Sequence, residues 1–512
     1  MRSSITTLVL FAVTAAACSG IPTLNGGESF LQPEPVSKKV TVQVLAGDDL
    51  TSVSADVEID GVSYQTGEDG ILSFEWNDEQ RGFSPILAVS AGGFEVAVKE
   101  LMDYPEDGQI EIRLDPVVLR GRVVTIDEQV IPDVEVRLGD AQVWTDDQGQ
   151  FSFVRAQAGS LTLLRPAWAD LSEQWDGVAD QLVFVMEPRF VRALRVSSQI
   201  AGKDLEWSRL LDLASGSGVN GLVVDIKNER GQVLHDTSVS IAHRIGAVNP
   251  AYDLDQLVAD MEEVGFYKIS RIVVFQDTIL AIADPTFAVW NAESASAWRT
   301  GAGEAWIDPT DPDAWEYSLE LAVEACRRGF DEVQFDYVSF PFGGSLENAE
   351  FDGFNVSDYG SKEAQQQRMD AISAYLNEAR DRLNPLGCAV AANVFSILLE
   401  SETDEGIGQM PESLSSVVDV LSPTIYTHLY PDGWAGFSEP DDNAPEIVGI
   451  AVRAGLQRLD GLAIMRPWVQ RAFLEPEEIR AVQNQVESNS LGWMLWSANS
   501  DFKADMLPPE VE

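Results

Sequence analysis

The sequence predicts an α/β fold, a (β/α)8 TIM barrel preceded by two small all-β sandwich domains. Eight apolar runs alternate with helix-like stretches after residue 189, and two β-rich blocks of similar pattern come before them. No glycine-rich phosphate fingerprint follows the first apolar runs, which counts against a dinucleotide-binding fold. With 512 residues, the chain is also too long for a single hydrophobic core.

The composition is that of a globular and strongly acidic protein. Hydrophobic residues make up 45% of the chain, far from the profile of a disordered sequence. The formal net charge of −49 argues against nucleic acid as a partner, because the phosphates would be repelled. It is compatible with saline surroundings and says nothing about the chemistry.

The N-terminus predicts export and lipid anchoring. Residues 1–18 contain a basic start at Arg2, an apolar run too short to span a bilayer, and small residues before Cys18. Ala15-Ala16-Ala17-Cys18 resembles a bacterial lipobox, which implies cleavage before Cys18 and its acylation; ordinary secretion is the alternative. We therefore expect a cell-envelope protein on a membrane anchor, with 19–38 as a Gly/Pro/Ser-rich linker.

The two β-rich blocks, 39–116 and 117–188, repeat one pattern of alternating strand, acidic glycine turn and strand. Its copies are "ADVEIDGVSYQTGEDGILSF" and "PDVEVRLGDAQVWTDDQGQFSF". The second block resembles the carboxypeptidase regulatory-like (transthyretin-like) domain in Gly121-Arg122-Val123, Ile131-Pro132 and "TDDQGQFSF" with Gly149. That resemblance implies a non-catalytic spacer or binding module.

Residues 189–512 carry the predicted barrel, with continuous apolar strands that should be buried on both faces. The predicted strands are 191–197, 221–228, 270–277, 331–340, 388–397, 417–427, 462–470 and 491–498, and the clearest helices are 253–265, 313–329 and 362–383. Two exported cysteines could pair, but Cys326 falls in a helix-like run and Cys388 opens a strand, so we expect two buried free thiols and no metal site.

Polar and aromatic side chains follow these strands, at the end where such barrels place their active sites. Carboxylates, amides and tryptophans in one opening suit a sugar, since indoles stack on pyranose rings and carboxylates serve as acid, base or nucleophile. The candidates that contact substrate are Lys227, Glu229, Tyr337, Asn393, Tyr426, His428, Trp468, Gln470 and Trp496, and the candidate catalytic carboxylates are Asp336, Asp225 and Asp277.

Six motifs lie in order between residues 190 and 505: "GVNGLVVDIKNERG", "YKISRIVVFQDTILA", "WIDPTDPDAWEYSLELAVEACRRGFDEVQFDYVSFP", "DVLSPTIYTHLYPDGW", "RPWVQ" and "GWMLWSANSDF". Through them the chain resembles the putative glycosyl hydrolase domain family of bacterial (β/α)8 barrels, which is distantly related to the amylase-like barrels. This resemblance implies that Asp336, at the end of strand four, is the leading catalytic carboxylate. Two positions depart from the family pattern: Ser339 stands where it usually has arginine, and Asn393 where it has aspartate.

Structural roles compete with several of these functional ones. Asp336 could salt-bridge a neighbouring cation, Asp225 and Lys227 could pair with each other, and Asp277 could cap the next helix. The two tryptophans could pack in the barrel. Because Asn393 cannot carry a proton as a carboxyl does, Asp225, Glu229, Asp277 or Glu400 would have to supply the second carboxylate.

These features predict a lipid-anchored glycoside hydrolase that acts on a polysaccharide of the cell envelope without a cofactor. The alternative is a non-catalytic carbohydrate-binding or scaffold lipoprotein on a degenerate barrel, which Asn393 and Ser339 favour. In a third reading, the enzyme acts during envelope assembly and the sandwiches dock a partner. A second carboxylate near Asp336 separates hydrolase from binder.

Overall fold

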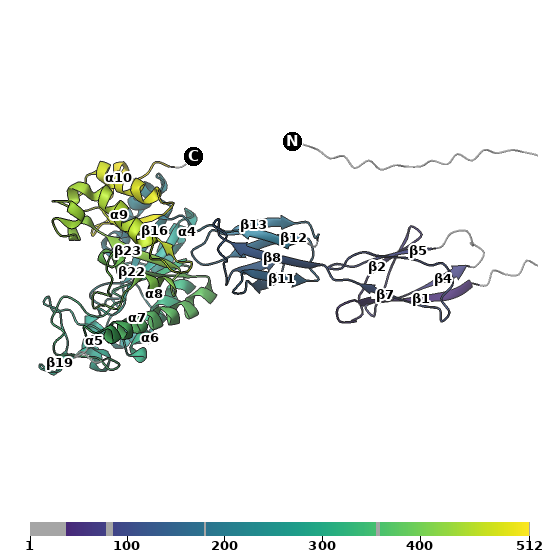
Figure 1. Cartoon of the computed structure of the whole chain (residues 1–512), viewed down its shortest axis with the longest axis horizontal. Coiled ribbons are helices and arrows are strands. Elements are labelled where there is room, and N and C mark those ends of the chain that lie inside the picture. The colour runs from purple at the N-terminus through teal and green to yellow at the C-terminus, as the bar shows by residue number, and fades with distance from the viewer. Residues whose placement is uncertain (1–36, 78–84, 179–180, 355–358, 511–512) are drawn as a thin grey trace, which may run out of the picture. The chain divides into compact units, whose positions relative to one another are not determined.

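A computed structural model describes residues 37–77, 85–178, 181–354 and 359–510 (Figure 1). The predicted signal peptide, Cys18 and most of the predicted linker lie outside the described residues. The chain divides into two compact units, Met1–Val117 and Val118–Glu512. Among the helices of the described residues, none combines the length and the apolar character needed to cross a membrane.

The first unit folds as two small sheets with strand orders β4-β1-β7 and β3-β2-β5-β6. Burial alternates along β7, as expected for a strand with one face on a core. Val42, Val57 and Ile112 belong to that core. The strands are β1 (Ser37–Ala46), β2 (Asp56–Ile59), β3 (Val62–Gln65), β4 (Ile71–Asn77), β5 (Ile86–Ser90), β6 (Ala97–Glu100) and β7 (Gln109–Leu114).

The second unit begins with the same arrangement seven strands later, in the orders β11-β8-β14 and β10-β9-β12-β13. Gly70 and Gly149 occupy equivalent turns at φ +74° and +70°, where a Cβ would lie 2.5 Å from Val44 O and 2.6 Å from Val123 O. The predicted repeat thus reflects a shared strand order. The strands are β8 (Val118–Val124), β9 (Glu135–Leu138), β10 (Ala141–Trp144), β11 (Gln150–Val154), β12 (Gly159–Leu164), β13 (Leu171–Trp175) and β14 (Gln181–Val185).

The rest of this unit is a closed parallel barrel, which confirms the predicted fold class. The barrel strands pair in parallel around the ring, with β26 joined to β15 and β22 joined to β23. All seven residues of β16 are buried, as for a strand covered on both faces. The strands are β15 (Arg192–Val196), β16 (Gly221–Lys227), β17 (Tyr267–Val273), β20 (Glu332–Asp336), β22 (Ala389–Phe395), β23 (Val420–Ile425), the broken pair β24 (Ile464–Met465) and β25 (Trp468–Gln470), and β26 (Trp493–Trp496).

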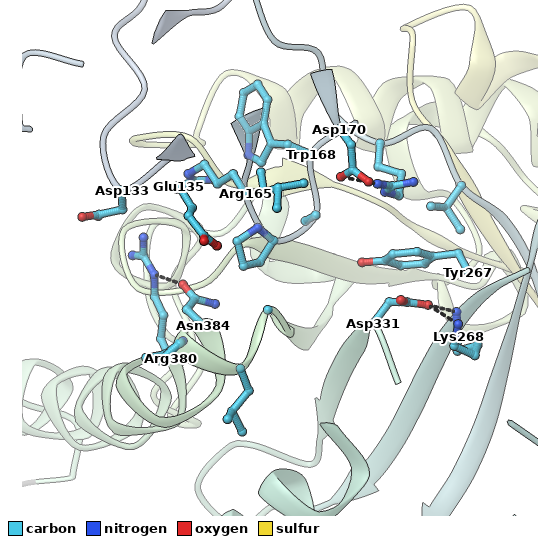
Figure 2. Close-up of a pocket in the computed structure, with 18 of the residues that line it drawn as sticks. Asp133, Glu135, Arg165, Trp168, Asp170, Tyr267, Lys268, Asp331, Arg380 and Asn384 are labelled. Atoms are coloured by element: carbon cyan, nitrogen blue, oxygen red, sulfur yellow. Dashed lines mark hydrogen bonds and ion pairs between the residues drawn. The ribbon is translucent and has the colours of Figure 1, made fainter. Parts of the chain in front are cut away.

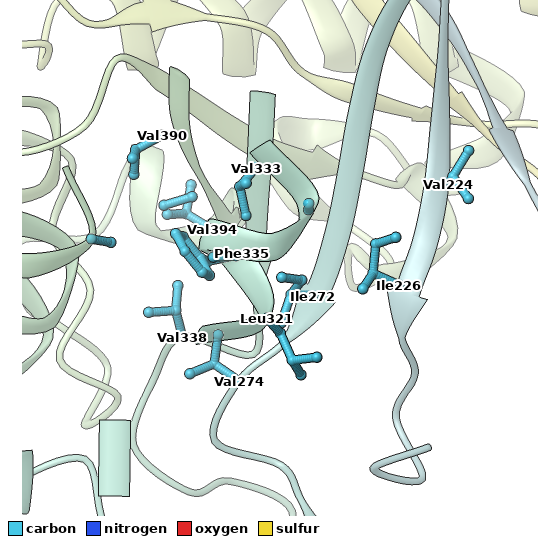
Figure 3. Close-up of a cluster of buried hydrophobic side chains, with 14 of the residues drawn as sticks. Val224, Ile226, Ile272, Val274, Leu321, Val333, Phe335, Val338, Val390 and Val394 are labelled. Atoms are coloured by element: carbon cyan, nitrogen blue, oxygen red, sulfur yellow. The ribbon is translucent and has the colours of Figure 1, made fainter. Parts of the chain in front are cut away.

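Helices cover the outside of the barrel. Leu321 of α6 belongs to one buried cluster with Ile272 of β17 and Phe335 of β20 (Figure 3). The helices are α1 (Ser198–Ala201), α2 (Asp204–Ser215), α3 (Ser240–Arg244), α4 (Leu254–Glu263), α5 (Thr278–Ala283), α6 (Pro312–Arg327), α7 (Lys362–Leu383), α8 (Pro411–Ser415), α9 (Ala444–Leu456) and α10 (Pro476–Glu487). Three short strands, β18 (Trp290–Asn291), β19 (Ser296–Ala297) and β21 (Ala349–Glu350), form a small sheet in the loops.

Two expectations differ from the structure. Strand three, predicted over 270–277, is Tyr267–Val273, because the chain leaves the sheet before Asp277 caps α5. The expectation of free thiols is wrong, since Cys326 and Cys388 form a disulfide with Cα atoms 5.9 Å apart. The end of α6 and the start of β22 lie at the same end of the barrel, so the fold brings together two cysteines 62 residues apart.

Candidate active site

Charged residues gather at the end of the barrel where the strands finish, which we call the mouth; the opposite end is the floor. Asp336 is the last residue of β20, and Asp225 of β16 lies directly across from Arg271 of β17. A buried arginine in an apolar strand requires anionic partners.

The Arg271 guanidinium binds three carboxylates at once. Asp336 Oδ2 lies 2.7 Å from Nε and 2.6 Å from Nη2, Glu229 Oε1 lies 2.6 Å from Nη2, and Asp225 Oδ1 lies 3.2 Å from Nη1. Burial alone would lower the pKa of Arg271, but the three negative charges outweigh it and raise that pKa well above its usual value. Arg271 is therefore a fixed positive charge at the centre of the mouth.

Asp225 is fully engaged by two arginines and is 2% exposed. Its Oδ1 accepts from Arg271 and its Oδ2 from Arg195, whose Nη1 also donates to Ala498 O at 2.7 Å. This position orients the two arginines and favours a supporting role for Asp225 over direct catalysis.

Asp336 keeps a partly open position. Its side chain is 17% exposed, with Oδ2 held by Arg271 and Oδ1 accepting from the Tyr337 amide at 2.8 Å. Tyr337 has φ +51°, a left-handed backbone that turns the chain out of β20 directly after Asp336. Burial and the charge of Asp336 raise the pKa of Tyr337 to about 12, so its hydroxyl stays protonated.

Glu229 provides a second carboxylate beside Asp336, and its side chain is 35% exposed. Both carboxylates bind the same Arg271 nitrogen, so Asp336 Oδ2 and Glu229 Oε1 lie no more than twice 2.6 Å, about 5.2 Å, apart. Burial opposes ionisation of Glu229, but the charge and hydrogen bond of Arg271 prevail and lower its pKa. These two oxygens are therefore closer together than the roughly 6.5–9.5 Å that separates the carboxyl groups of inverting glycosidases.

Aromatic side chains surround this charged cluster. Trp496 lies beneath Arg195 and Arg271, whose Cζ atoms are 4.6 and 5.0 Å from its ring centroid. The ring centroid of Tyr426 lies 6.5 Å from that of Trp496 and 6.0 Å from that of His428, on which Tyr426 stacks. Burial and then the charge of Asp336 raise the pKa of Tyr426 well above its usual value.

His428 is an exposed residue at this mouth, where its Nδ1 lies 2.7 Å from Oε1 of the buried Gln470. Its ring is 5.2 Å from Phe473, which is 73% exposed. This exposed imidazole and phenyl ring give a surface on which a sugar ring can rest. Gln470 positions His428 from below.

Besides the buried Asp225 and Gln470, four further predicted site residues lie in the interior. Trp468 is fully buried, and its Nε1 lies 3.0 Å from Asn393 Oδ1, so these two residues pack beneath the mouth. Lys227 and Asp277 form a buried ion pair of 2.7 Å, and Asp277 Oδ1 also accepts from the Leu280 amide at the start of α5. Their geometry favours structural roles.

The pairing of Asp225 with Lys227, raised from their spacing, does not form. The register shifts between these two residues, so Lys227 pairs with Ile272, which faces the helices. The Lys227 ammonium lies 5.5 Å from the ring centroid of Tyr317 on α6. A β-bulge therefore turns Lys227 away from the mouth.

Arg271 and Arg195 are the residues that sequence reasoning missed. Each is the second cation of its strand, Arg271 after Lys268 in "YKISRIV" and Arg195 after Arg192 in "RALRV". Because a buried cation needs anionic partners, an arginine within a predicted buried strand indicates that carboxylates lie close to it. Their partners become known only with the strand register.

Glu400 follows β22 at the mouth end of the barrel and is exposed. Partial burial raises its pKa, and its charge acts on Tyr430. Glu400 therefore holds a proton to higher pH than Glu229 does.

Known proteins resemble the barrel. A family model described as "Putative glycosyl hydrolase domain" matches residues 193–502. The structure of a hypothetical protein from Ruminiclostridium thermocellum ATCC 27405 has 29% identity and a TM-score of 0.34, covering 38% of this chain and 96% of that one. The glycoside hydrolase domain of PgaB (BpsB) from Bordetella bronchiseptica has 12% identity and a TM-score of 0.46, covering 61% and 95%.

The catalytic domain of a beta-amylase from Paenibacillus polymyxa has 10% identity and a TM-score of 0.42, covering 62% of this chain and 95% of that one. A comparison with curated proteins gives no match. The family match covers more than half of the chain and runs from the first barrel strand to beyond the last. The chain belongs to the putative glycosyl hydrolase domain family.

Proposed function

We propose that this protein is a lipid-anchored glycoside hydrolase that acts on a polysaccharide at the cell envelope, with Asp336 as its principal catalytic carboxylate. The observation that carries the proposal is the pair formed by Asp336 and Glu229. One oxygen of each carboxylate lies 2.6 Å from Nη2 of Arg271, so these two oxygens are at most about 5.2 Å apart. Both side chains are partly exposed at the mouth of a barrel that belongs to the putative glycosyl hydrolase domain family.

In this proposal, Asp336 attacks the anomeric carbon while Glu229 protonates the departing glycosidic oxygen. The resulting glycosyl ester is then hydrolysed by water, which gives a proton to Glu229 as it attacks, and Asp336 leaves as a carboxylate. Arg271 holds Asp336 in place through the two contacts to Oδ2. The configuration at the anomeric carbon is retained.

A substrate sugar would contact Tyr426, His428, Trp496 and Tyr337. These side chains support the assignment because they surround the charged cluster and, apart from the exposed His428, are each partly exposed. The chemistry uses side chains of this chain alone, so the proposal requires no cofactor.

Anchoring at the envelope is supported by Arg2, the apolar run and Cys18 in the sequence. Cys18→Ser should move the expressed protein from the membrane fraction to the soluble fraction. An unchanged distribution would reject the lipid anchor without affecting the hydrolase assignment.

Carbohydrate binding without turnover is a second candidate, which Asn393 favours. This amide stands where the family has an aspartate, and it is buried against Trp468 rather than open to a substrate.

A panel of polysaccharides incubated with wild type and with Asp336→Asn distinguishes the two. Release of reducing ends by wild type but not by the variant supports the hydrolase. Equal release by both removes Asp336 from the mechanism, and sugar binding without any release supports the binder.

A further inference from the structure

A cavity lies at the floor of the barrel, on the opposite end from Asp336. It has a volume of about 1120 Å³ and is lined both by the sheets of β8–β14 and by residues where the barrel strands begin. Figure 2 shows Asp133, Glu135, Arg165 and Trp168 of the sandwich and Tyr267, Lys268 and Asp331 of the barrel, which line this cavity together. The cavity is slightly larger than the roughly 300–1,000 Å³ typical of small-molecule sites.

One turn of the sandwich carries Arg165 and Trp168, two buried residues that line this cavity. Residues 165–168 form a tight turn in which the Trp168 amide donates to Arg165 O at 3.0 Å, and Ala167 is held at φ +67°. Arg165 Nε donates to Pro132 O at 3.3 Å, and its Cζ lies 5.5 Å from the Trp168 ring centroid. The backbone and its neighbours thus fix both side chains in place.

Both donors have an unused hydrogen. Arg165 is 7% exposed and Trp168 is 2% exposed, yet within the described part of the chain Arg165 Nη1 and Trp168 Nε1 have no hydrogen-bond partner. Unpaired buried donors are costly, and an acceptor oxygen of a ligand would remove that cost. Burial also lowers the pKa of Arg165, so its charge is incompletely compensated by the carboxylates around it.

The rest of the lining identifies the class of ligand. Cations and carboxylates are nearly balanced, which does not favour a phosphate or another strongly charged anion. Trp144 and Phe190 also line the cavity and are 56% and 37% exposed, so they offer aromatic faces beside the buried donors. Aromatic faces, hydrogen-bond donors and free carboxylate oxygens together match a neutral sugar, whose hydroxyls both accept and donate.

We propose that this cavity binds a segment of a neutral oligosaccharide through Arg165, Trp168 and Trp144, apart from the catalytic mouth. The inference rests on the proposed carbohydrate substrate and extends it. Such a site holds a long glycan against the floor while another part of the same or a second chain reaches Asp336, which raises the effective concentration of substrate at the mouth.

The test is isothermal titration calorimetry of the full chain carrying Asp336→Asn, with maltohexaose, cellohexaose and chitohexaose as separate probes. Trp144→Ala removes an exposed side chain and should leave the fold intact, whereas Arg165→Gln removes the buried donor. Tyr64→Ala, at a residue 40% exposed in the first unit, is the matched control. We expect at least one probe to bind, with binding weakened about tenfold or more by Trp144→Ala and by Arg165→Gln and unchanged by Tyr64→Ala.

Equal affinities in the Trp144 and Tyr64 variants would overturn the proposal, as would failure of all three probes to bind. Binding of inorganic phosphate in place of glycan, lost in Arg165→Gln, would overturn it in favour of an anion site. Hydrolysis of the same probes is measured in a separate experiment with the chain that retains Asp336. Turnover without cavity binding rejects only this site, and cavity binding without turnover rejects only the hydrolase.

Discussion

Arg271 holds Asp336 through two nitrogens, with Nε at 2.7 Å and Nη2 at 2.6 Å from Asp336 Oδ2. The same guanidinium also binds Glu229 and Asp225, so one cation holds the proposed catalytic pair together and lowers the pKa of Glu229. A planar guanidinium can do this because its five N–H donors form a rigid fork.

Arg271→Lys should lower kcat/KM about 100-fold, because an ammonium is a point charge that cannot bridge three carboxylates. The measurement is hydrolysis of the panel substrate at one pH, with circular dichroism to check folding. Arg453→Lys, at an exposed position on α9, is the matched control and should have no effect. Equal kcat/KM in wild type and Arg271→Lys would contradict the role of the guanidinium.

The pH dependence of kcat/KM should report the proton on Glu229. Activity needs this carboxyl protonated, so activity is present below its pKa and is lost as the pH rises through it. Since Arg271 overcomes the effect of burial and lowers that pKa, the alkaline limb should lie below the ordinary glutamate value of 4.5.

An alkaline limb above 4.5 would contradict Glu229 as the proton donor and point to Glu400, whose pKa burial raises. Glu400→Gln would then abolish that limb. With Glu229 as the donor, Glu400→Gln leaves the profile in place.

Much of the fold could be predicted from the sequence, because buried strands on both faces leave continuous apolar runs such as β16. The position of Asp336 and Glu229 at the mouth could also be predicted, since they lie at or just after the ends of strands. Lys227 was misplaced because a bulge in β16 changes its face, and a bulge leaves no clear mark in composition. The role of Arg271 could not be predicted, because only the register between β16 and β17 places it beside Asp225.

The disulfide also could not be predicted from the local sequence. Cys326 and Cys388 looked unrelated because one ends a helix and the other precedes a strand, and only the closed barrel places those two points side by side. Long-range neighbours of this kind follow from topology and not from local pattern.

Asp277→Asn should destabilise the barrel by about 3–5 kcal/mol, because it leaves the ammonium of Lys227 buried without its partner. Turnover of the folded protein should stay near that of wild type. Urea unfolding measures the loss, and Asp255→Asn, which breaks a surface pair with Arg328, should cost at most about 1 kcal/mol. Lost turnover at unchanged stability would instead make Asp277 catalytic.

Replacing both Cys326 and Cys388 by serine should lower the free energy of unfolding by about 4 kcal/mol, given the 62-residue separation that the disulfide closes. The measurement is denaturant unfolding beside the oxidised wild type. In that wild type, unfolded without reductant, neither residue should react with a thiol reagent. Two reactive thiols from these positions would contradict the disulfide.

The most direct test of the central claim is to trap the glycosyl-enzyme intermediate. The full chain is incubated with a 2-deoxy-2-fluoro glycoside of the sugar that it hydrolyses, and the labelled peptide is identified by mass spectrometry. We predict one label per chain, on Asp336, and no label in Asp336→Asn, while Asp432→Asn at an exposed site is labelled like wild type. A label on any other residue, or products of inverted configuration, would contradict the account.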